Sequence, residues 1–161
     1  MQALKIYSTA IAPEWIDYNG HLRDAYYCLV LSFAADALMD HLGLDAAYRH
    51  ETTCTLYTLE QHFHFLHEVK AADQLDVGVR LLAADRKRML VAFDFYCARY
   101  LDPVAIGEVV LLHVRQGEAA SAPATVPFPP PVAAAIDRLL AATSAIEPPG
   151  PASRRLELRA R

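Results

Sequence analysis

An apolar stretch from Asp24 to Leu42 constrains the fold of this 161-residue chain more than any other feature. It contains no glycine or proline, and it is followed by Gly43, a residue typical of helix C-termini. The pattern therefore predicts one long helix. Its polar or small positions recur at every fourth residue and form only a narrow stripe: Asp24, Cys28, Ser32, Asp36 and Asp40. Most of the helix surface must therefore be buried, and the rest of the chain must cover it.

Strand-forming segments supply this cover. A first strand is expected at residues 3–11, and four more follow the helix at residues 54–69, 74–84, 88–100 and 104–115. The connections between them are short, which requires antiparallel pairing because parallel strands need long crossovers. A short helix is expected at residues 132–142, with Pro131 suited to its first turn. We predict an α+β fold: an antiparallel sheet of about five strands wrapped around one central helix.

Composition limits the classes of function. A formal net charge of −4 argues against a dedicated nucleic-acid binder, which would carry a clustered basic surface. The chain begins with no apolar signal segment and contains no run long enough to span a bilayer, so no membrane association is expected. Three separated cysteines without a Cys-x-x-Cys motif indicate reduced thiols in a cytoplasmic protein. We expect one folded domain over residues 1–143 and a flexible, proline- and arginine-rich tail over residues 144–161.

The segment just before the long helix has the residues for acyl-group chemistry. Asp17 lies in a tight loop with Asn19 and Gly20, and the helix begins near Asp24. Such a loop can place a carboxylate beside the N–H groups at the positive end of the helix, which polarise a carbonyl oxygen. Asp17 could attack a thioester carbonyl or draw a proton from water, or it could merely organise its own turn. His21 could orient Asp17, donate to the carbonyl oxygen or cap the helix.

Later strands carry polar side chains that could line a ligand cleft. Glu60, His62 and His64 share one face of their strand. This set fits a polar cleft wall better than a zinc site, because no supporting cysteine or histidine cluster is evident, and we expect no metal. Glu108 stands among valines, where a carboxylate is costly unless it is paired or solvated. It therefore either faces the cleft or bonds to a loop.

A basic turn is expected at Arg86, Lys87 and Arg88. Cations of this kind could bind the phosphates of an acyl carrier, or they could simply form a solvated turn. The glycines are too widely spaced for a phosphate-binding loop or a dinucleotide fingerprint. No serine lies in a Gly-x-Ser-x-Gly motif, so a serine-hydrolase nucleophile is not expected.

Residues 15–27 resemble the signature loop and helix start of hot-dog-fold acyl-CoA thioesterases of the 4-hydroxybenzoyl-CoA thioesterase type. The family pattern of an Asp, a Gly and a Tyr falls on Asp17, Gly20 and Tyr27. The resemblance implies that Asp17 is the nucleophile or general base and that N–H groups near Asp24 bind the thioester oxygen. It also implies an acyl-CoA substrate with no separate cofactor, bound across the interface of a homodimer or homotetramer. A sheet with open edge strands favours such an assembly as well.

A narrower likeness connects the chain with thioesterases of carnitine breakdown, in which a betainyl-CoA thioesterase is free-standing or fused to carnitine dehydrogenase. The similar segments are residues 57–62, 65–69, 85–88 and 108–114. The chain differs in having Gln61 where those proteins have a Thr, and Ile106 and Gly107 in place of Ala-Thr. These differences concern the substrate more than the fold.

The acyl group distinguishes the remaining interpretations. A trimethylammonium group favours an aromatic cage, and the sequence offers Trp15, Tyr18, Tyr57, Phe63 and Phe65 for one. A hot-dog hydratase or dehydratase would instead need a paired histidine and acid at the pocket, for which Asp17 and His21 on one loop are a poor substitute. A non-catalytic acyl-CoA binder would bind its ligand without turnover.

Overall fold

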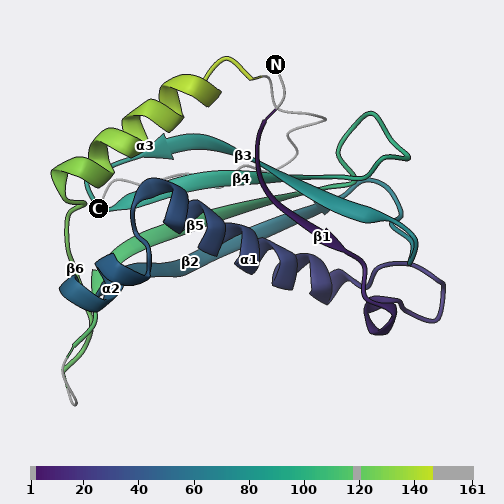
Figure 1. The fold of residues 1–161 in the computed structure, drawn as a ribbon, viewed down its shortest axis with the longest axis horizontal. Helices are drawn as coiled ribbons and strands as arrows, with labels where there is room; N and C mark the ends of the chain where they lie inside the picture. The colour runs from purple at the N-terminus through teal and green to yellow at the C-terminus, as the bar shows by residue number, and fades with distance from the viewer. Residues whose placement is uncertain (1–2, 118–120, 147–161) are drawn as a thin grey trace.

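A curled antiparallel sheet holds the long helix in a computed structural model that describes residues 3–117 and 121–146. The helix α1 spans Asp24–Leu42, the range predicted from the sequence. The strand bounds are β1 Leu4–Ala10, β2 Cys54–Phe65, β3 Gln74–Ala84, β4 Arg88–Tyr96 and β5 Ala105–Arg115. The order of these strands in the sheet is β1-β3-β4-β5-β2 (Figure 1). Strands β1 and β2 therefore lie at the two ends of this order, and β3, β4 and β5 lie between them. The predicted α+β hot-dog architecture is confirmed.

Two predicted strands are too long. Strand β2 ends at Phe65 because the next two amides, those of Leu66 and His67, both donate to the Val104 carbonyl (2.9 and 3.0 Å) and turn the chain away from the ladder. Strand β4 ends at Tyr96 because the following residues form a turn. Both strands are therefore shorter than predicted at the same end of the sheet.

Three short elements were not predicted. They are the 3-10 helix η1 (Pro13–Trp15), the helix α2 (Ala46–Thr52) and the strand β6 (Ala124–Thr125). Helix α2 begins at Asp45, whose Oδ1 accepts a hydrogen bond from the Tyr48 amide (2.9 Å). Strand β6 pairs with the last residues of β5. Each of these elements is stabilised by local hydrogen bonds or by a few long-range ones rather than by the burial of a periodic apolar face.

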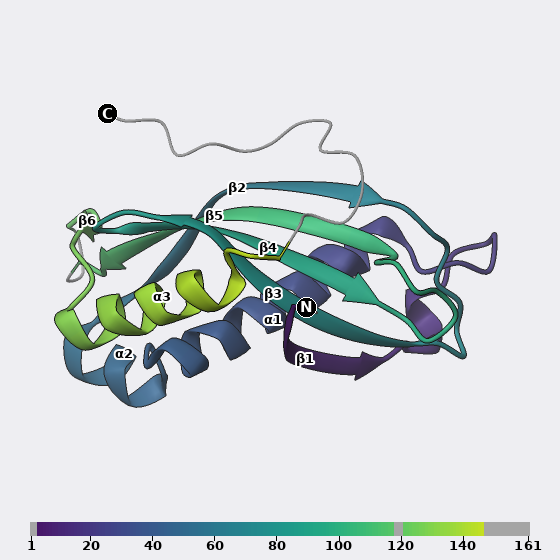
Figure 2. The ribbon, with the colours of Figure 1, turned by 90° about the horizontal axis from the view of Figure 1, so that it is seen from above.

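The core lies between α1 and the concave face of the sheet. Helix α3 (Pro130–Thr143), predicted at residues 132–142, lies beside α1 on the same side of the sheet (Figure 2). The Leu81 amide donates to Thr143 Oγ1 (3.1 Å), which joins the last turn of α3 to β3. Full burial of an aliphatic side chain stabilises the fold by about 1.5–3 kcal/mol. The side chains that α1 buries are Tyr27, Val30, Leu31, Ala34, Leu38, Met39 and Leu42.

Strand β2 forms one edge of the sheet. Within the described residues it pairs with β5 alone. Tyr57 (38% exposed), Leu59 (50%) and Phe65 (53%) place large apolar surface on this strand in contact with solvent. An exposed, apolar edge strand of this length is a ready site for pairing with another chain.

Other sequence expectations fall outside the sheet. All three cysteines are free thiols. Among the described residues, no single helix has the length and apolarity to cross a membrane; α1 and α2 meet these criteria only as a pair, and the chain bends by 76° between them. The tail predicted beyond residue 143 lies outside the described residues from residue 147 onward.

A buried ion pair joins β3 to β4 on the sheet face opposite α1. Arg80 Nε and Nη2 donate to the two oxygens of Asp94 (2.6 and 2.7 Å), and both side chains are almost completely buried. Burial alone would lower the pKa of the Arg80 guanidinium, but the bonds to Asp94 outweigh this effect and raise it. The Arg80 guanidinium therefore keeps its charge although it is buried.

We expect Asp94→Asn to reduce the free energy of unfolding by about 3–5 kcal/mol, because it leaves the Arg80 charge buried without an anion. Asp76→Asn is the matched control: it removes a carboxylate from the same pair of strands, but one whose partner, Lys5 at 2.8 Å, is exposed. The control should cost at most about 1 kcal/mol. Urea unfolding of both variants measures the difference, and equal losses would contradict the prediction.

Candidate active site

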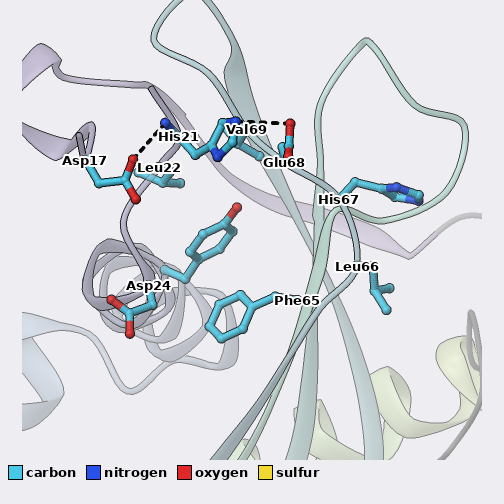
Figure 3. A pocket seen from close by; sticks show the side chains of 10 residues that line it. Asp17, His21, Leu22, Asp24, Phe65, Leu66, His67, Glu68 and Val69 are labelled. Carbon is cyan, nitrogen blue, oxygen red and sulfur yellow. Dashed lines mark hydrogen bonds and ion pairs between the residues drawn. The ribbon is translucent and has the colours of Figure 1, made fainter. Parts of the chain in front are cut away.

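A pocket of about 360 Å³ opens where the loop before α1 meets the segment after β2. Figure 3 shows Asp17, His21 and Glu68 along one side of this pocket, with Asp24 and Phe65 opposite them. The lining residues are Asp17, His21, Leu22, Asp24, Tyr27, Phe65, Leu66, His67, Glu68 and Val69. Four sequence-predicted site residues, Asp17, His21, Asp24 and Tyr27, are thus brought together.

Asp17 is fixed by backbone bonds within its own loop. Its Oδ1 accepts hydrogen bonds from the amides of Asn19 (2.8 Å) and His21 (3.1 Å). The Asp17 amide donates to the His21 carbonyl (2.8 Å), and Gly20 adopts a φ of +81°, which closes the turn in a conformation that favours glycine. Asn19 and Gly20 therefore shape the loop rather than line the pocket. Asp17 both organises the turn and presents a carboxylate to the pocket.

The two amide bonds keep this carboxylate ionised. The bond from the His21 amide is the largest cause of a lowered pKa at Asp17, and the bonds from Asn19 act in the same direction against a smaller effect of desolvation. At neutral pH Asp17 is therefore an anion that can serve as a nucleophile or as a base.

The N-terminus of α1 lies at the opposite side of the pocket. The N-cap residue, Arg23, makes no side-chain hydrogen bond to the helix, so no side chain satisfies the first amides from that position. The Asp24 carboxylate accepts from the Ala25 amide (2.8 Å), which places a negative charge in the first turn. The Tyr26 amide donates to the Arg23 carbonyl (3.0 Å), so among the described residues the Asp24 amide is the N–H group of this turn that is open to a carbonyl oxygen.

His21 connects two carboxylates. Its amide donates to Asp17, and its Nε2 lies 3.1 Å from Glu68 Oε2. The amide of Leu22 donates to the Val69 carbonyl (2.7 Å), which brings the loop before α1 against the segment after β2. The sequence left three roles open for His21: orienting Asp17, donating to the carbonyl oxygen and capping the helix. In the structure, the backbone amide of His21 contacts Asp17 and its ring contacts Glu68.

Aromatic rings form the inner wall. Tyr27 is buried and meets Phe65 edge-on at 5.1 Å and Phe95 at 5.7 Å. Burial raises the pKa of the Tyr27 hydroxyl, which therefore stays protonated. Two candidates for an aromatic cage lie outside this wall: Trp15 stacks on Tyr26 at 5.3 Å, and Tyr18 is 94% exposed at the tip of the loop.

The polar residues predicted on β2 and β5 face the other side of the sheet. A Cβ on Gly107 would point at Leu31 of α1, so Glu108 points away from the helix, and His62 pairs with Glu108 across the strands. His62 meets His64 edge-on at 4.4 Å, and Glu60 is exposed beside a bulge. None of these residues lines the Asp17 pocket. Within the described residues, no group of three or more potential ligands could hold a metal ion.

The basic turn lines a separate pocket of about 680 Å³ at the opposite end of β3. Arg88 is held by Asp85 (2.6 Å), whereas Arg86 is exposed and Lys87 Nζ reaches Thr125 Oγ1 at 3.4 Å. Strand β3 separates this turn from the Asp17 pocket by about 33 Å, from 11 residues at the usual rise per residue. Arg86 and Lys87 are the cations left to bind an anion.

Glu68 lines the pocket but was not predicted to belong to the site, and Phe65 was predicted only as one of five candidates for an aromatic cage. Both belong to the segment 65–69, whose likeness to carnitine-related thioesterases was the available signal. Their place in the pocket depends on the pairing of Leu22 with Val69, which lie 47 residues apart in sequence. No local pattern encodes such a pairing.

Known proteins share the family and the fold of this chain. A family model described as the Thioesterase-like superfamily matches residues 11–136. A betainyl-CoA thioesterase of Pseudomonas aeruginosa is 43% identical over 148 residues, which is 92% of this chain and 91% of that protein. A crystal structure of a candidate thioesterase from Pseudomonas putida KT2440 is 36% identical, covers 99% of each chain and has a TM-score of 0.80. A Staphylococcus aureus protein, determined in complex with CoA, shares the fold at 21% identity with a TM-score of 0.83 over 99% of this chain and 98% of that one.

The fold, the family match and the near-complete coverage of this chain and its relatives define the class of the protein as a hot-dog thioester hydrolase. The chain belongs to the Thioesterase-like superfamily, as its resemblance in residues 15–27 predicted.

We expect the Asp17 carboxyl to titrate below its ordinary value near 3.9. Because the folded pKa is depressed, the bonds to Asn19 and His21 stabilise the protein above about pH 4, and this contribution is lost as the pH falls through the lowered pKa. Carboxyl ¹³C NMR measures the titration, and Asp17→Asn assigns the resonance by removing it. A midpoint at or above the ordinary value would contradict the described loop.

Proposed function

We propose that this protein hydrolyses a short acyl-CoA thioester, with betainyl-CoA as the leading candidate, to the free acid and CoA. The observation that carries the proposal is the ionised Asp17 carboxylate, fixed by two amides in a pocket that also contains the start of α1. The betainyl-CoA thioesterase of P. aeruginosa, 43% identical across nearly the whole of both chains, supports the choice of acyl group.

Each pocket feature has a role in this reaction. N–H groups at the start of α1 hold the thioester oxygen and stabilise the negative charge that develops on it. Asp17 either attacks the carbonyl carbon to form a mixed anhydride that water opens, or draws a proton from the water that attacks. In both routes the C–S bond breaks, the CoA sulfur gains a proton and water supplies the oxygen of the new acid. The proposal includes no cofactor besides the CoA of the substrate.

The His21–Glu68 pair is the one observation that favours a second activity. A hydratase needs a paired histidine and acid at its pocket, and these two side chains lie 3.1 Å apart there. Hydration of crotonyl-CoA is therefore included among the assays. The family match favours hydrolysis, and we expect no hydration of this enoyl ester.

We expect Asp17→Asn to lower the turnover of betainyl-CoA by about two orders of magnitude or more, with little change in stability. The amide oxygen of Asn can still accept the Asn19 and His21 bonds, so the loop is preserved while the charge is lost. Thiol release from betainyl, short-chain, long-chain and aromatic CoA esters gives the rates. Asp24→Asn, which changes another pocket carboxylate in the same way, is the matched control and should lose much less. Activity that survives in Asp17→Asn would assign catalysis to another group.

We also propose that the CoA nucleotide binds at the basic turn of a second protomer. Asp17 and Arg86 lie at opposite ends of β3, too far apart for one extended pantetheine arm within a chain. Pairing of two β2 edge strands in antiparallel orientation would bring opposite ends of two protomers toward each other. The exposed apolar side chains of Tyr57 and Leu59 on β2 support this homodimer.

A mixing experiment tests the shared site. We expect Arg86→Ala with Lys87→Ala to raise the KM for a CoA ester about tenfold while leaving the matching pantetheine thioester, which has no phosphates, nearly unchanged. Subunit exchange between this variant and Asp17→Asn should then restore sites with the wild-type KM, because one intact Asp17 meets one intact basic turn. A failure to restore activity in mixed dimers would contradict binding across protomers.

A further inference from the structure

The charged side chains that line the Asp17 pocket are carboxylates. Its ionisable side chains are the carboxylates of Asp17, Asp24 and Glu68, the rings of His21 and His67 and the protonated Tyr27 hydroxyl, with no lysine or arginine among the described lining residues. An anionic lining disfavours acyl groups that carry a carboxylate and favours cationic ones. The CoA phosphates must then be bound elsewhere, which agrees with the position of the basic turn.

The three carboxylates differ in the hydrogen-bond and ion-pair partners that they already have. Asp17 accepts two amides and Asp24 accepts the Ala25 amide, so both are tied to the backbone. Glu68 instead contacts a side chain, with its Oε2 3.1 Å from His21 Nε2, and it is 61% exposed. Its carboxylate can therefore turn toward a bound group without breaking the loop before α1.

The backbone of Glu68 is nevertheless held in place. Arg99 Nη2 donates to the Glu68 carbonyl (2.7 Å) and also bonds Asp73 Oδ2 (2.7 Å), which fixes the segment from outside the pocket. The Leu22–Val69 bond fixes it from the other side (2.7 Å). A carboxylate on a fixed backbone gives a defined location for charge recognition.

An aromatic ring accompanies this carboxylate. Phe65 lies in the same segment, lines the pocket and is 53% exposed, while Tyr27 supports its ring edge-on at 5.1 Å. A quaternary ammonium carries no N–H and cannot be recognised by hydrogen bonds. It is recognised by negative charge and by aromatic faces, which are what Glu68 and Phe65 supply.

We propose that Glu68 is the specificity-determining residue of this pocket and that, with Phe65, it selects short acyl groups bearing a quaternary ammonium next to the thioester. The inference rests on the proposed thioesterase function. It adds to that function a residue whose role is to distinguish cationic from neutral acyl groups rather than to act on the carbonyl.

The test uses two esters of the same shape and different charge. In 3,3-dimethylbutyryl-CoA a carbon atom replaces the nitrogen of betainyl-CoA. The intrinsic reactivities of the two esters are the same for every variant, so the change in their ratio of kcat/KM between wild type and variant measures charge recognition. We expect Glu68→Gln to lower this ratio about five- to tenfold, mainly through the KM for betainyl-CoA, and to change the neutral ester less than about twofold. The wild-type preference should also shrink with added salt, and that of Glu68→Gln should not.

Two further variants complete the design. Asp137→Asn removes the same charge from the exposed surface of α3 and should leave the ratio unchanged. Glu68→Asp keeps the charge and should keep most of the preference, which tests the inference even if Glu68→Gln is poorly folded.

Each other outcome is decisive. Equal losses for both esters in Glu68→Gln would show that Glu68 only positions His21 and would overturn the inference while leaving the thioesterase function intact. An unchanged ratio in a folded Glu68→Gln would do the same. Wild-type protein that hydrolyses neither ester would overturn the proposed function, and this inference with it.

Discussion

The burial of α1 is the constraint on which the rest of the structure depends. A helix that is apolar on most of its surface is unstable when exposed to water. One short chain can bury the apolar side chains of such a helix only by curling a sheet around it. The sheet leaves the first turn of the helix open at the Asp17 pocket, and the first backbone N–H groups of any helix lack a partner four residues earlier in the same helix. In the proposed reaction, the helix that the sheet buries is therefore also the element whose first turn binds the thioester oxygen.

The elements that follow a single periodic pattern could be predicted from the sequence, and the others could not. Helix α1 and strand β3 have the predicted bounds because an uninterrupted period ends at clear turn signals. Strand β2 was predicted too long because residues 66–69 contain no turn signal, while the amides of Leu66 and His67 bond a carbonyl outside the ladder. Helix α2 was missed because it is short and no face of it is buried.

The candidate site divides in the same way. The Asp17 loop could be predicted because its bonds join residues at most four apart, so the Asp-Asn-Gly pattern contains the information needed to form it. The contact between His21 and Glu68 could not, because it follows from the meeting of two distant segments. Glu60, His62 and His64 show the converse: strand alternation correctly groups them on one face, but alternation alone does not reveal which face the helix covers.

The placement of Glu68 just beyond the end of β2 has a consequence for how such proteins diversify. Segment 66–69 takes no part in the strand ladders of the sheet, and it contributes one buried side chain, that of Val69, to the core. In the proposed complex, substitutions at position 68 therefore change the charge presented to the acyl group at little cost to the free energy of folding. A lineage could exchange one acyl substrate for another by mutating this short segment, while the helix, the sheet and the Asp17 loop are inherited unchanged.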